Sequence, residues 1–218
     1  MMRFALLLLA ITMTGCAPHE GARPIFNGRN LDGWKGLTGN PVSRSKMSPG
    51  ELAEAQAKAD ERMREHWSVV DGVLVFDGGG DSLVTARDYE NFELWVDWKI
   101  KPRGDSGIYL RGSPQVQIWD DKIGSGGLYN NQRNLSKPLV VADNPVGEWN
   151  SFHIVMHGDR VTVWLNGQLV VDDVPLENYW DRSIPIYPSG AIELQNHGNT
   201  LYFRNIYIRE LPSKSEPG

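Results

Sequence analysis

WSVVDGVLVF, residues 67–76, consists of two short runs rich in β-branched residues on either side of Asp71-Gly72. Asp-Gly between two such runs is a strong signal for a two-residue type I′ hairpin. The same arrangement recurs where Asn166-Gly167 separates residues 161–165 from residues 168–171. Further short alternating runs, bounded by turn residues, occupy residues 92–100, 107–111, 116–119, 152–157, 191–195 and 201–209. This series of short strands predicts an all-β fold, a jelly-roll-like β-sandwich of two packed sheets.

One segment departs from this β pattern. Ser48-Pro49-Gly50-Glu51 has the form of a capping box with proline at the first helical position, and an alanine- and charge-rich stretch follows. The pattern predicts one short surface helix near residues 49–64. Leu52, Ala55, Ala59 and Met63 recur at helical spacing, so we expect a narrow apolar stripe that packs on the sandwich or beside the mouth of a site.

The N-terminus has the features of an export signal. Arg3 gives a basic start, and residues 4–11 form an apolar run too short to span a bilayer. Cys16, the only cysteine, follows Thr14-Gly15 as in bacterial lipoprotein signals, which also excludes a disulfide framework. We expect residues 1–15 to be a signal peptide, Cys16 to be lipidated and residues 16–23 to be a linker. An ordinary signal peptide with an incidental thiol is the alternative.

Length and charge limit the remaining possibilities. About two hundred mature residues fit one sandwich domain, residues 24–211, followed by a polar tail over residues 212–218 to which we assign no structure. The net charge is −5 with no cluster of Lys and Arg, which argues against a nucleic-acid partner. We expect an exported lipoprotein in the periplasm or outer membrane, held at the membrane only by its N-terminal acyl chains.

Strand alternation sorts side chains by face, because successive residues of a strand point to opposite sides of a sheet. In four of the runs the face opposite the apolar set is polar and aromatic. If these four strands are neighbours in one sheet, that face gathers Glu93, Trp95, Asp97, Tyr109, Arg111, Gln115, Gln117, Trp119, Glu193, Gln195 and His197. Carboxylates, amides and guanidinium groups bind vicinal hydroxyls, and aromatic rings cover the apolar faces of sugars. The alternative is an ordinary solvated face whose tryptophans shield hairpins.

Eight short motifs occur in an order that resembles a known family. They are Phe26-Asn27-Gly28 through Leu31-Asp32-Gly33-Trp34, Asn91 to Leu94, Gly104 to Arg111, Val116 to Ile118, Gly126 to Tyr129, Gly147 to Asn150, Trp164 to Gly167, and Ile192 to Gly198. Together, over about residues 24–210, they resemble the 3-keto-disaccharide hydrolase domain. The resemblance implies a concanavalin A-like jelly roll that acts on 3-keto-glycosides by elimination and then rehydration. One departure is Gln115, where family members often carry glutamate.

Elimination from a 3-keto sugar needs a base for the proton on carbon 2, a donor or cation for the enolate oxygen, and an acid for the departing oxygen. Our first candidate base or acid is His197, since imidazole titrates near neutrality and Glu193 shares its expected face. Asp97 or Glu93 is the alternative base. Arg111 is the candidate enolate partner, and a salt bridge to one of these carboxylates is an equally good account of it.

The other residues of the expected face are assigned to substrate binding: Trp95, Tyr109, Gln115, Gln117, Trp119 and Gln195. A conventional two-carboxylate glycosidase is less favoured, because Glu93 and Asp97 would lie about 13 Å apart along one strand, although Glu193 could supply a partner. No organic cofactor is expected, and a divalent metal is left open. Two function classes remain, an enzyme cleaving 3-keto-glycosides and a non-catalytic carbohydrate-binding lipoprotein.

Overall fold

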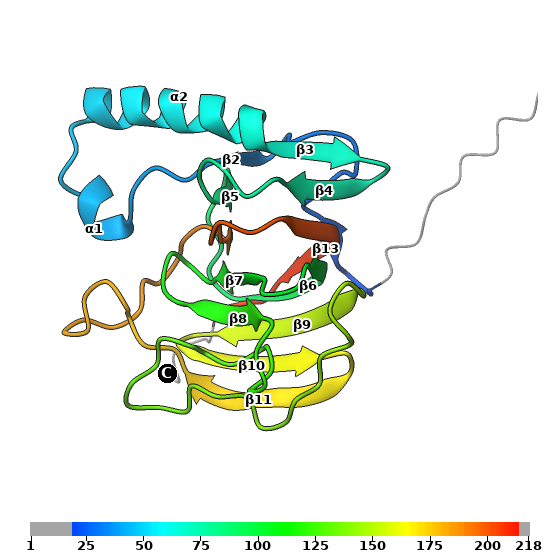
Figure 1. Cartoon of the computed structure of the whole chain (residues 1–218). Helices are drawn as coiled ribbons and strands as arrows, with labels where there is room; N and C mark the ends of the chain where they lie inside the picture. The colour runs from blue at the N-terminus through cyan, green and yellow to red at the C-terminus, as the bar shows by residue number, and fades with distance from the viewer. Residues whose placement is uncertain (1–18, 214–218) are drawn as a thin grey trace, which may run out of the picture.

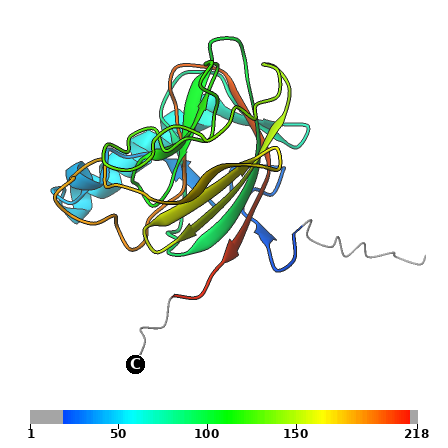
Figure 2. The same cartoon turned by 90° about the horizontal axis from the view of Figure 1, so that it is seen from below.

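Two antiparallel sheets packed face to face form the body of the protein in the computed structural model, which describes residues 19–213 (Figure 1). The eight-stranded sheet has the order β11 (Gln168–Pro175), β10 (Arg160–Leu165), β9 (Asn150–His157), β6 (Phe92–Ile100), β13 (Leu201–Glu210), β4 (Val73–Phe76), β3 (Trp67–Val70), and β1 (Arg23–Pro24) also pairs with β13. The five-stranded sheet has the order β2 (Trp34–Gly36), β5 (Leu83–Thr85), β12 (Glu193–Leu194), β7 (Asp105–Tyr109), β8 (Gln115–Trp119). The predicted all-β jelly-roll sandwich is confirmed, and Figure 2 shows how the larger sheet curves around the smaller one.

Both hairpins predicted from the sequence are present. Asp71 and Gly72 adopt φ angles of 50° and 79°, and β3 and β4 pair on either side of them. Asn166 and Gly167 adopt the same two angles between β10 and β11. Positive φ at both central residues is what a type I′ turn requires.

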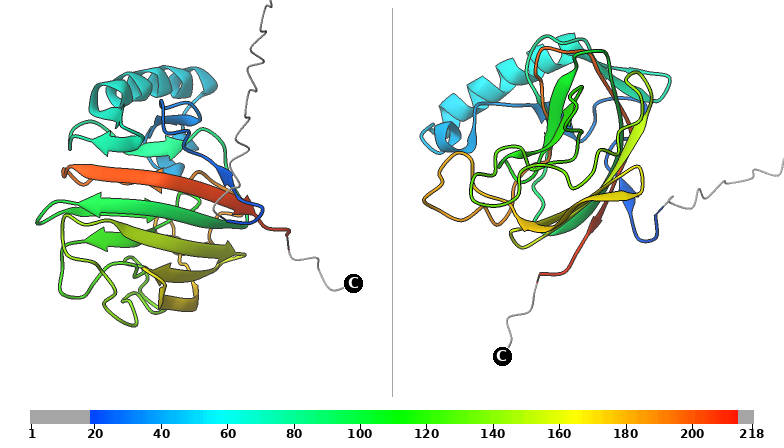
Figure 3. Two further views of the ribbon diagram at one scale, coloured as in Figure 1. Left: turned by 90° about the vertical axis from the view of Figure 1, so that its right-hand side faces the viewer. Right: turned by 60° about the horizontal axis from the view of Figure 1, so that its bottom comes forward.

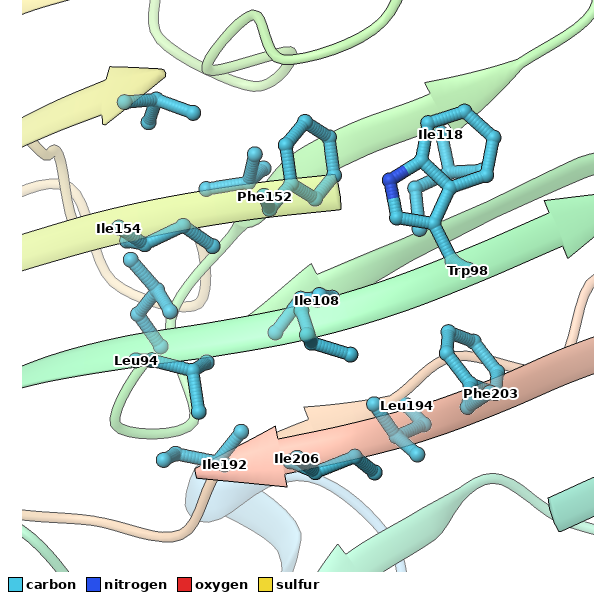
Figure 4. Close-up of a cluster of buried hydrophobic side chains, with 14 of the residues drawn as sticks. Leu94, Trp98, Ile108, Ile118, Phe152, Ile154, Ile192, Leu194, Phe203 and Ile206 are labelled. Atoms are coloured by element: carbon cyan, nitrogen blue, oxygen red, sulfur yellow. The ribbon is translucent and has the colours of Figure 1, made fainter. Parts of the chain in front are cut away.

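The core lies between the two sheets. The apolar set of β6, from Phe92 to Ile100 at every second position, is at most 4% exposed. Figure 4 shows Leu94 and Trp98 of this strand in one cluster with Ile108, Ile118 and Ile192 of the other layer. Each such aliphatic or aromatic side chain contributes roughly 1.5–3 kcal/mol when it leaves water.

The predicted helix is α2, Pro49–His66, two residues longer than expected at its C-terminal end. Its capping box is present, since the Ser48 side chain accepts from the Glu51 amide and the Glu51 carboxylate accepts from the Ser48 amide. Ala59, on the predicted stripe, packs against Gly36 of β2, where a Cβ atom would lie 2.2 Å from the Ala59 carbonyl oxygen. The glycine therefore allows the helix to lie directly on the edge of the five-stranded sheet.

A second, shorter helix, α1 (Pro41–Arg44), was not predicted. Its N-cap is Asn40, whose side chain accepts from the Ser43 amide, and proline occupies its first helical position. The short strands β1, β2 and β5, two or three residues long, were missed as well. In the part of the chain that the structure describes, no helix is long and apolar enough to cross a membrane. The expected signal peptide, Cys16 and residues 214–218 lie outside the described residues.

The prediction that four strands lie in one sheet and share one polar-aromatic face is wrong. β6 lies in the eight-stranded sheet, whereas β7, β8 and β12 are neighbours in the five-stranded sheet. Alternation distinguishes the inner from the outer face of a strand, but it carries no information about which sheet the strand joins. The outer residues of β6 and those of the other three strands therefore lie on opposite sides of the molecule.

Candidate functional site

A cleft of about 1090 Å³ lies over the outer face of the five-stranded sheet. One wall is formed by α1 and the first half of α2, which contribute Arg44, Leu52 and Gln56. The opposite wall is the segment before β12, which contributes Trp180 and Tyr187. Trp180 is fixed by a hydrogen bond of 2.5 Å from its indole nitrogen to the Gly112 carbonyl. The cleft is thus built from segments far apart in the sequence around a floor of strands.

The floor is a row of residues set by strand register. Lys35 pairs with Val84, Val84 with Glu193, Glu193 with Tyr109, and Tyr109 with Gln115. Directly paired residues of neighbouring strands point to the same side of a sheet, so these side chains share one face. The short Val84 side chain stands between Lys35 and Glu193, which are two strand spacings, or about 10 Å, apart.

Glu193 is the buried carboxyl group of this floor. The residue is 8% exposed and lines the cleft. Burial raises the pKa of Glu193 to about 7, against the smaller opposing effects of a hydrogen bond with Ser82 and the charge of Arg44. A carboxylate that titrates near neutrality can take up and release a proton at physiological pH.

Tyr109 and Gln195 lie beside Glu193. The Gln195 amide nitrogen is 3.5 Å from the Tyr109 hydroxyl oxygen, and both residues line the cleft. Burial, followed by the negative charge of Glu193, raises the pKa of Tyr109. The phenol therefore stays protonated and remains a hydrogen-bond donor next to the carboxyl group.

Arg44 and Lys35 are cleft residues that the sequence did not single out. Arg44 Nη1 donates to the carbonyls of Thr38 and Gly39 at 3.2 and 2.9 Å, which holds the guanidinium against the cleft wall. Burial lowers the pKa of Arg44, and the charge of Glu193 is the largest of the effects that raise it. Asn40-Pro41, a helix N-cap followed by proline at the first helical position, was the sequence signal for the element that carries Arg44.

Next to the cleft, polar side chains form a chain of hydrogen bonds across β8 and β7. Gln115 donates to Gln117 at 2.5 Å, and Gln117 donates to Asp105 at 2.7 Å. Asp105 also lies 3.3 Å from Nδ1 of His197. The His197 side chain is 57% exposed and stands in the turn after β12; it is not one of the residues that line the cleft, although its neighbour Asn196 is. Gly107 leaves space for these hydrogen-bonded side chains, because a Cβ atom at this position would lie 2.7 Å from the Gln115 side chain.

Two predicted residues of this region have other partners. Trp119 donates its indole N–H to the Gly124 carbonyl at 2.7 Å and packs edge-on against Tyr129. Arg111 is 3% exposed, and its guanidinium donates to the carbonyls of Glu90, Pro188 and Gly158. Burial lowers the pKa of Arg111 to about 10. The salt bridge expected for Arg111 is not formed among the described residues; the side chain joins three loops instead, and the residue also lines the cleft.

The expected residues of β6 lie on the far side of the molecule. Glu93 receives Arg209 Nη2 on both carboxylate oxygens at 2.7 Å. Asp97 accepts from Ser151, Arg204 and Asn205. Trp95 stacks on His153 at 4.8 Å. These residues are therefore separated from Glu193 by the thickness of the sandwich, and the two groups do not form one site.

A sugar-sized cleft with one carboxyl group of pKa about 7, a protonated phenol, two cations and amide donors suits acid–base chemistry on a polyhydroxylated ligand. Among residues 19–213, no group of three or more His, Cys, Asp and Glu side chains is arranged to hold a metal ion. The outer faces of β7 and β12 therefore supply the candidate acid and base, and the two walls supply the contacts that would select a ligand.

Comparisons with known proteins agree with this description. Residues 21–209 match the family model of the 3-keto-α-glucoside-1,2-lyase-like domain. A 3-keto-disaccharide hydrolase of Bacteroides thetaiotaomicron is 23% identical, over 88% of this chain and 79% of that protein. A crystal structure from Parabacteroides distasonis, of a protein assigned as a glycosyl hydrolase, superposes with a TM-score of 0.65 at 26% identity, over 88% of this chain and 84% of that one. An endo-β-1,3(4)-glucanase of family GH16 shares the fold, with a TM-score of 0.51 at 12% identity, over 88% and 93% of the two chains.

Proposed function

Since the chain belongs to the family of 3-keto-α-glucoside-1,2-lyase-like domains, we propose that it cleaves 3-keto-glycosides by elimination followed by hydration. The observation that carries this proposal is Glu193, a carboxyl group in the floor of the cleft whose pKa burial raises to about 7. The hydrolase relative from Bacteroides thetaiotaomicron supports the same substrate class.

The elimination uses the acidity that a ketone at carbon 3 gives to the proton on carbon 2. Ionised Glu193 takes that proton, and the carbon–hydrogen electron pair delocalises into the ketone as an enolate. When the enolate collapses, a double bond forms between carbons 1 and 2, and the bond from carbon 1 to the departing oxygen breaks. The departing oxygen receives a proton and leaves as the free alcohol or sugar. No oxidant or reductant is consumed.

Three neighbouring groups fit the remaining roles. Arg44 and Lys35 supply positive charge for the enolate oxygen, where a preorganised donor contributes about 3 kcal/mol. Tyr109, protonated beside Glu193, is a donor for the departing oxygen. Gln195 and Gln56 contribute amide groups of the kind that bind sugar hydroxyls.

Hydration reverses the proton movements. Water adds to carbon 1 of the unsaturated sugar and gives up a proton to Tyr109, which lost its own to the departing oxygen, while protonated Glu193 returns a proton to carbon 2. The product is the free 3-keto sugar, so the two steps together amount to hydrolysis. One residue with a pKa near neutrality serves both steps, because it is a base in the first and an acid in the second.

The test is to incubate the purified protein with 3-keto-trehalose in deuterium oxide and to follow both the unsaturated intermediate and deuterium at carbon 2. The wild-type protein should form the intermediate and incorporate deuterium, and Glu193→Gln should do neither. Glu148→Gln, on the exposed turn before β9, is the matched control and should behave as wild type. Binding without turnover by the wild-type protein would instead support the carbohydrate-binding alternative.

His197 is the second candidate for the base, because Asp105 lies 3.3 Å from its ring and can orient it. The same assay separates the two assignments. Loss of deuterium incorporation in His197→Ala, with incorporation retained in Glu193→Gln, would transfer the role of base to His197.

The proposal includes the location of the protein. The basic start, apolar run and single cysteine of residues 1–16 support an exported lipoprotein anchored through Cys16 in the periplasm or outer membrane. Labelling of cells with an alkynyl fatty acid, followed by mass analysis of the mature N-terminus, tests it. A mature chain that begins elsewhere than at an acylated Cys16 would contradict it.

A further inference from the structure

The eight tryptophans differ in what their indole nitrogens contact. Four donate to backbone carbonyls, namely Trp34, Trp67, Trp119 and Trp180. Trp98 is buried in the core. The other three are Trp95, Trp149 and Trp164, and no hydrogen bond of their indole nitrogens occurs among the described residues. All three lie on the outer face of the eight-stranded sheet, opposite the cleft.

These tryptophans belong to an aromatic surface on that sheet. Tyr207, Trp95, His153 and Trp164 are paired in register across β13, β6, β9 and β10. The rings of Trp95, His153 and Trp164 stack at 4.8 and 4.7 Å, and a hollow of about 640 Å³ lies over them. We call these four residues, together with Trp149 and Tyr202, the aromatic face.

Cationic side chains are interspersed with the aromatic face. The Arg204 guanidinium lies 4.0 Å from the Trp149 ring, and Lys99 Nζ lies 4.9 and 4.7 Å from the rings of Trp149 and Tyr202. Trp and Tyr with Lys and Arg beside them is the composition that proteins present at the interface between lipid headgroups and water. Indole N–H groups without a partner among residues 19–213 fit this setting, because lipid phosphates and ester carbonyls accept hydrogen bonds.

The N-terminal segment is fastened to the same face. His19 stacks on Trp95 with ring centroids 4.2 Å apart, and Arg209 Nη1 donates to the Glu20 carbonyl at 3.0 Å. Arg23 and Pro24 then pair with β13. Figure 3 (left) shows this segment, in blue, beside the long strands of the sheet. Cys16 precedes His19 by three residues, and three residues of chain span about 10 Å at most.

We propose that the aromatic face rests on the lipid headgroups of the membrane that anchors the protein, so that the cleft opens away from the bilayer. The proposal rests on the lipidation of Cys16 proposed above and is independent of the catalytic assignment. It commits to one partner, a bilayer surface, because the first described residues after the anchor, from His19 to Pro24, lie on the same side of the sandwich as the aromatic face.

The test uses the full-length lipidated protein in phosphatidylethanolamine and phosphatidylglycerol vesicles that contain lipids spin-labelled near the headgroup. Tryptophan fluorescence should be quenched in these vesicles. Trp164→Phe should lose part of the quenched component, whereas Trp180→Phe, the matched change at the cleft wall, should retain it. Quenching that is lost with Trp180→Phe instead, or the absence of any quenching in the anchored protein, would overturn the proposal.

A second measurement does not depend on tryptophan. Thr162→Cys on the outer face of β10 and Ser189→Cys at the cleft, each labelled with an environment-sensitive nitrobenzoxadiazole dye, should differ: only the first should shift to the blue on vesicles. Shifts of equal size at both positions would overturn the orientation. A non-acylated mature N-terminus would contradict the membrane orientation, because that proposal rests on the lipidation of Cys16. Turnover of a 3-keto-glycoside would be unaffected, so the membrane proposal and the catalytic proposal fail separately.

Discussion

Glu193→Gln should make the stability of the fold less dependent on pH. The pKa of Glu193 is about 7 in the folded protein and 4.5 when the group is unperturbed. The folded state therefore binds this proton more tightly, and the free energy of unfolding falls as pH rises from about 4.5 to about 7. A difference of two and a half pKa units corresponds to roughly 3 kcal/mol. Glutamine cannot ionise, so the variant should not show this loss.

Urea unfolding at pH 5 and pH 8 measures the effect. The change in unfolding free energy between the two pH values should be smaller in Glu193→Gln than in wild type by about 2 to 3 kcal/mol, since only a minor part of the effect is present at pH 5. Any cost of burying the amide is the same at both pH values and cancels. Glu148→Gln should reproduce the wild-type dependence. The same dependence in wild type and Glu193→Gln would refute a raised pKa at this carboxyl group.

Further predictions concern the activity and the stability of variants in and around the cleft. With ionised Glu193 as the base, kcat/KM for a 3-keto-glycoside should rise with pH to half its plateau near pH 7; a profile that falls over that range would contradict the assignment. Arg111→Met should lower the unfolding free energy by about 3 kcal/mol or more, because three carbonyls lose their donor. An unchanged urea midpoint would refute the stabilising role of Arg111 in joining these three loops. Gly107→Ala should cost about 1–3 kcal/mol through the clash with Gln115, measured as a lower Tm. His197→Ala should leave the Tm nearly unchanged, because its ring is exposed, so any loss of turnover would be chemical.

Local sequence signals predicted the local structure. Asp71-Gly72 and Asn166-Gly167 defined both hairpins, and the Ser48 capping box defined the start of α2, because each signal acts within a few residues. The alternation in residues 92–100 predicted the buried set of β6 at every position. The short strands β1, β2 and β5 were missed because two or three residues are too few for a period-two pattern to be visible.

The site was predicted only in part, because its assembly depends on long-range strand pairing. Glu193, Tyr109 and Gln195 were correctly expected to share a face, since β7 and β12 are neighbours. Glu93 and Asp97 were placed with them although β6 belongs to the other sheet. Arg44 was missed because it enters the cleft from a four-residue helix, and nothing in the alternation of the strands points to it.

The three hydrogen bonds of Arg111 separate the floor of the cleft, which they hold in place, from the wall formed by residues 178–187, whose sequence can change. By holding the carbonyls of Glu90, Gly158 and Pro188 together, they fasten the chain immediately before β12 to turns of the opposite sheet. Residues 178–187 lie upstream of that fastening, so an insertion or a change of sequence there alters the wall while Glu193 keeps its register. If the proposed function holds, a change in this one loop should alter which glycosides fit the cleft without moving Glu193.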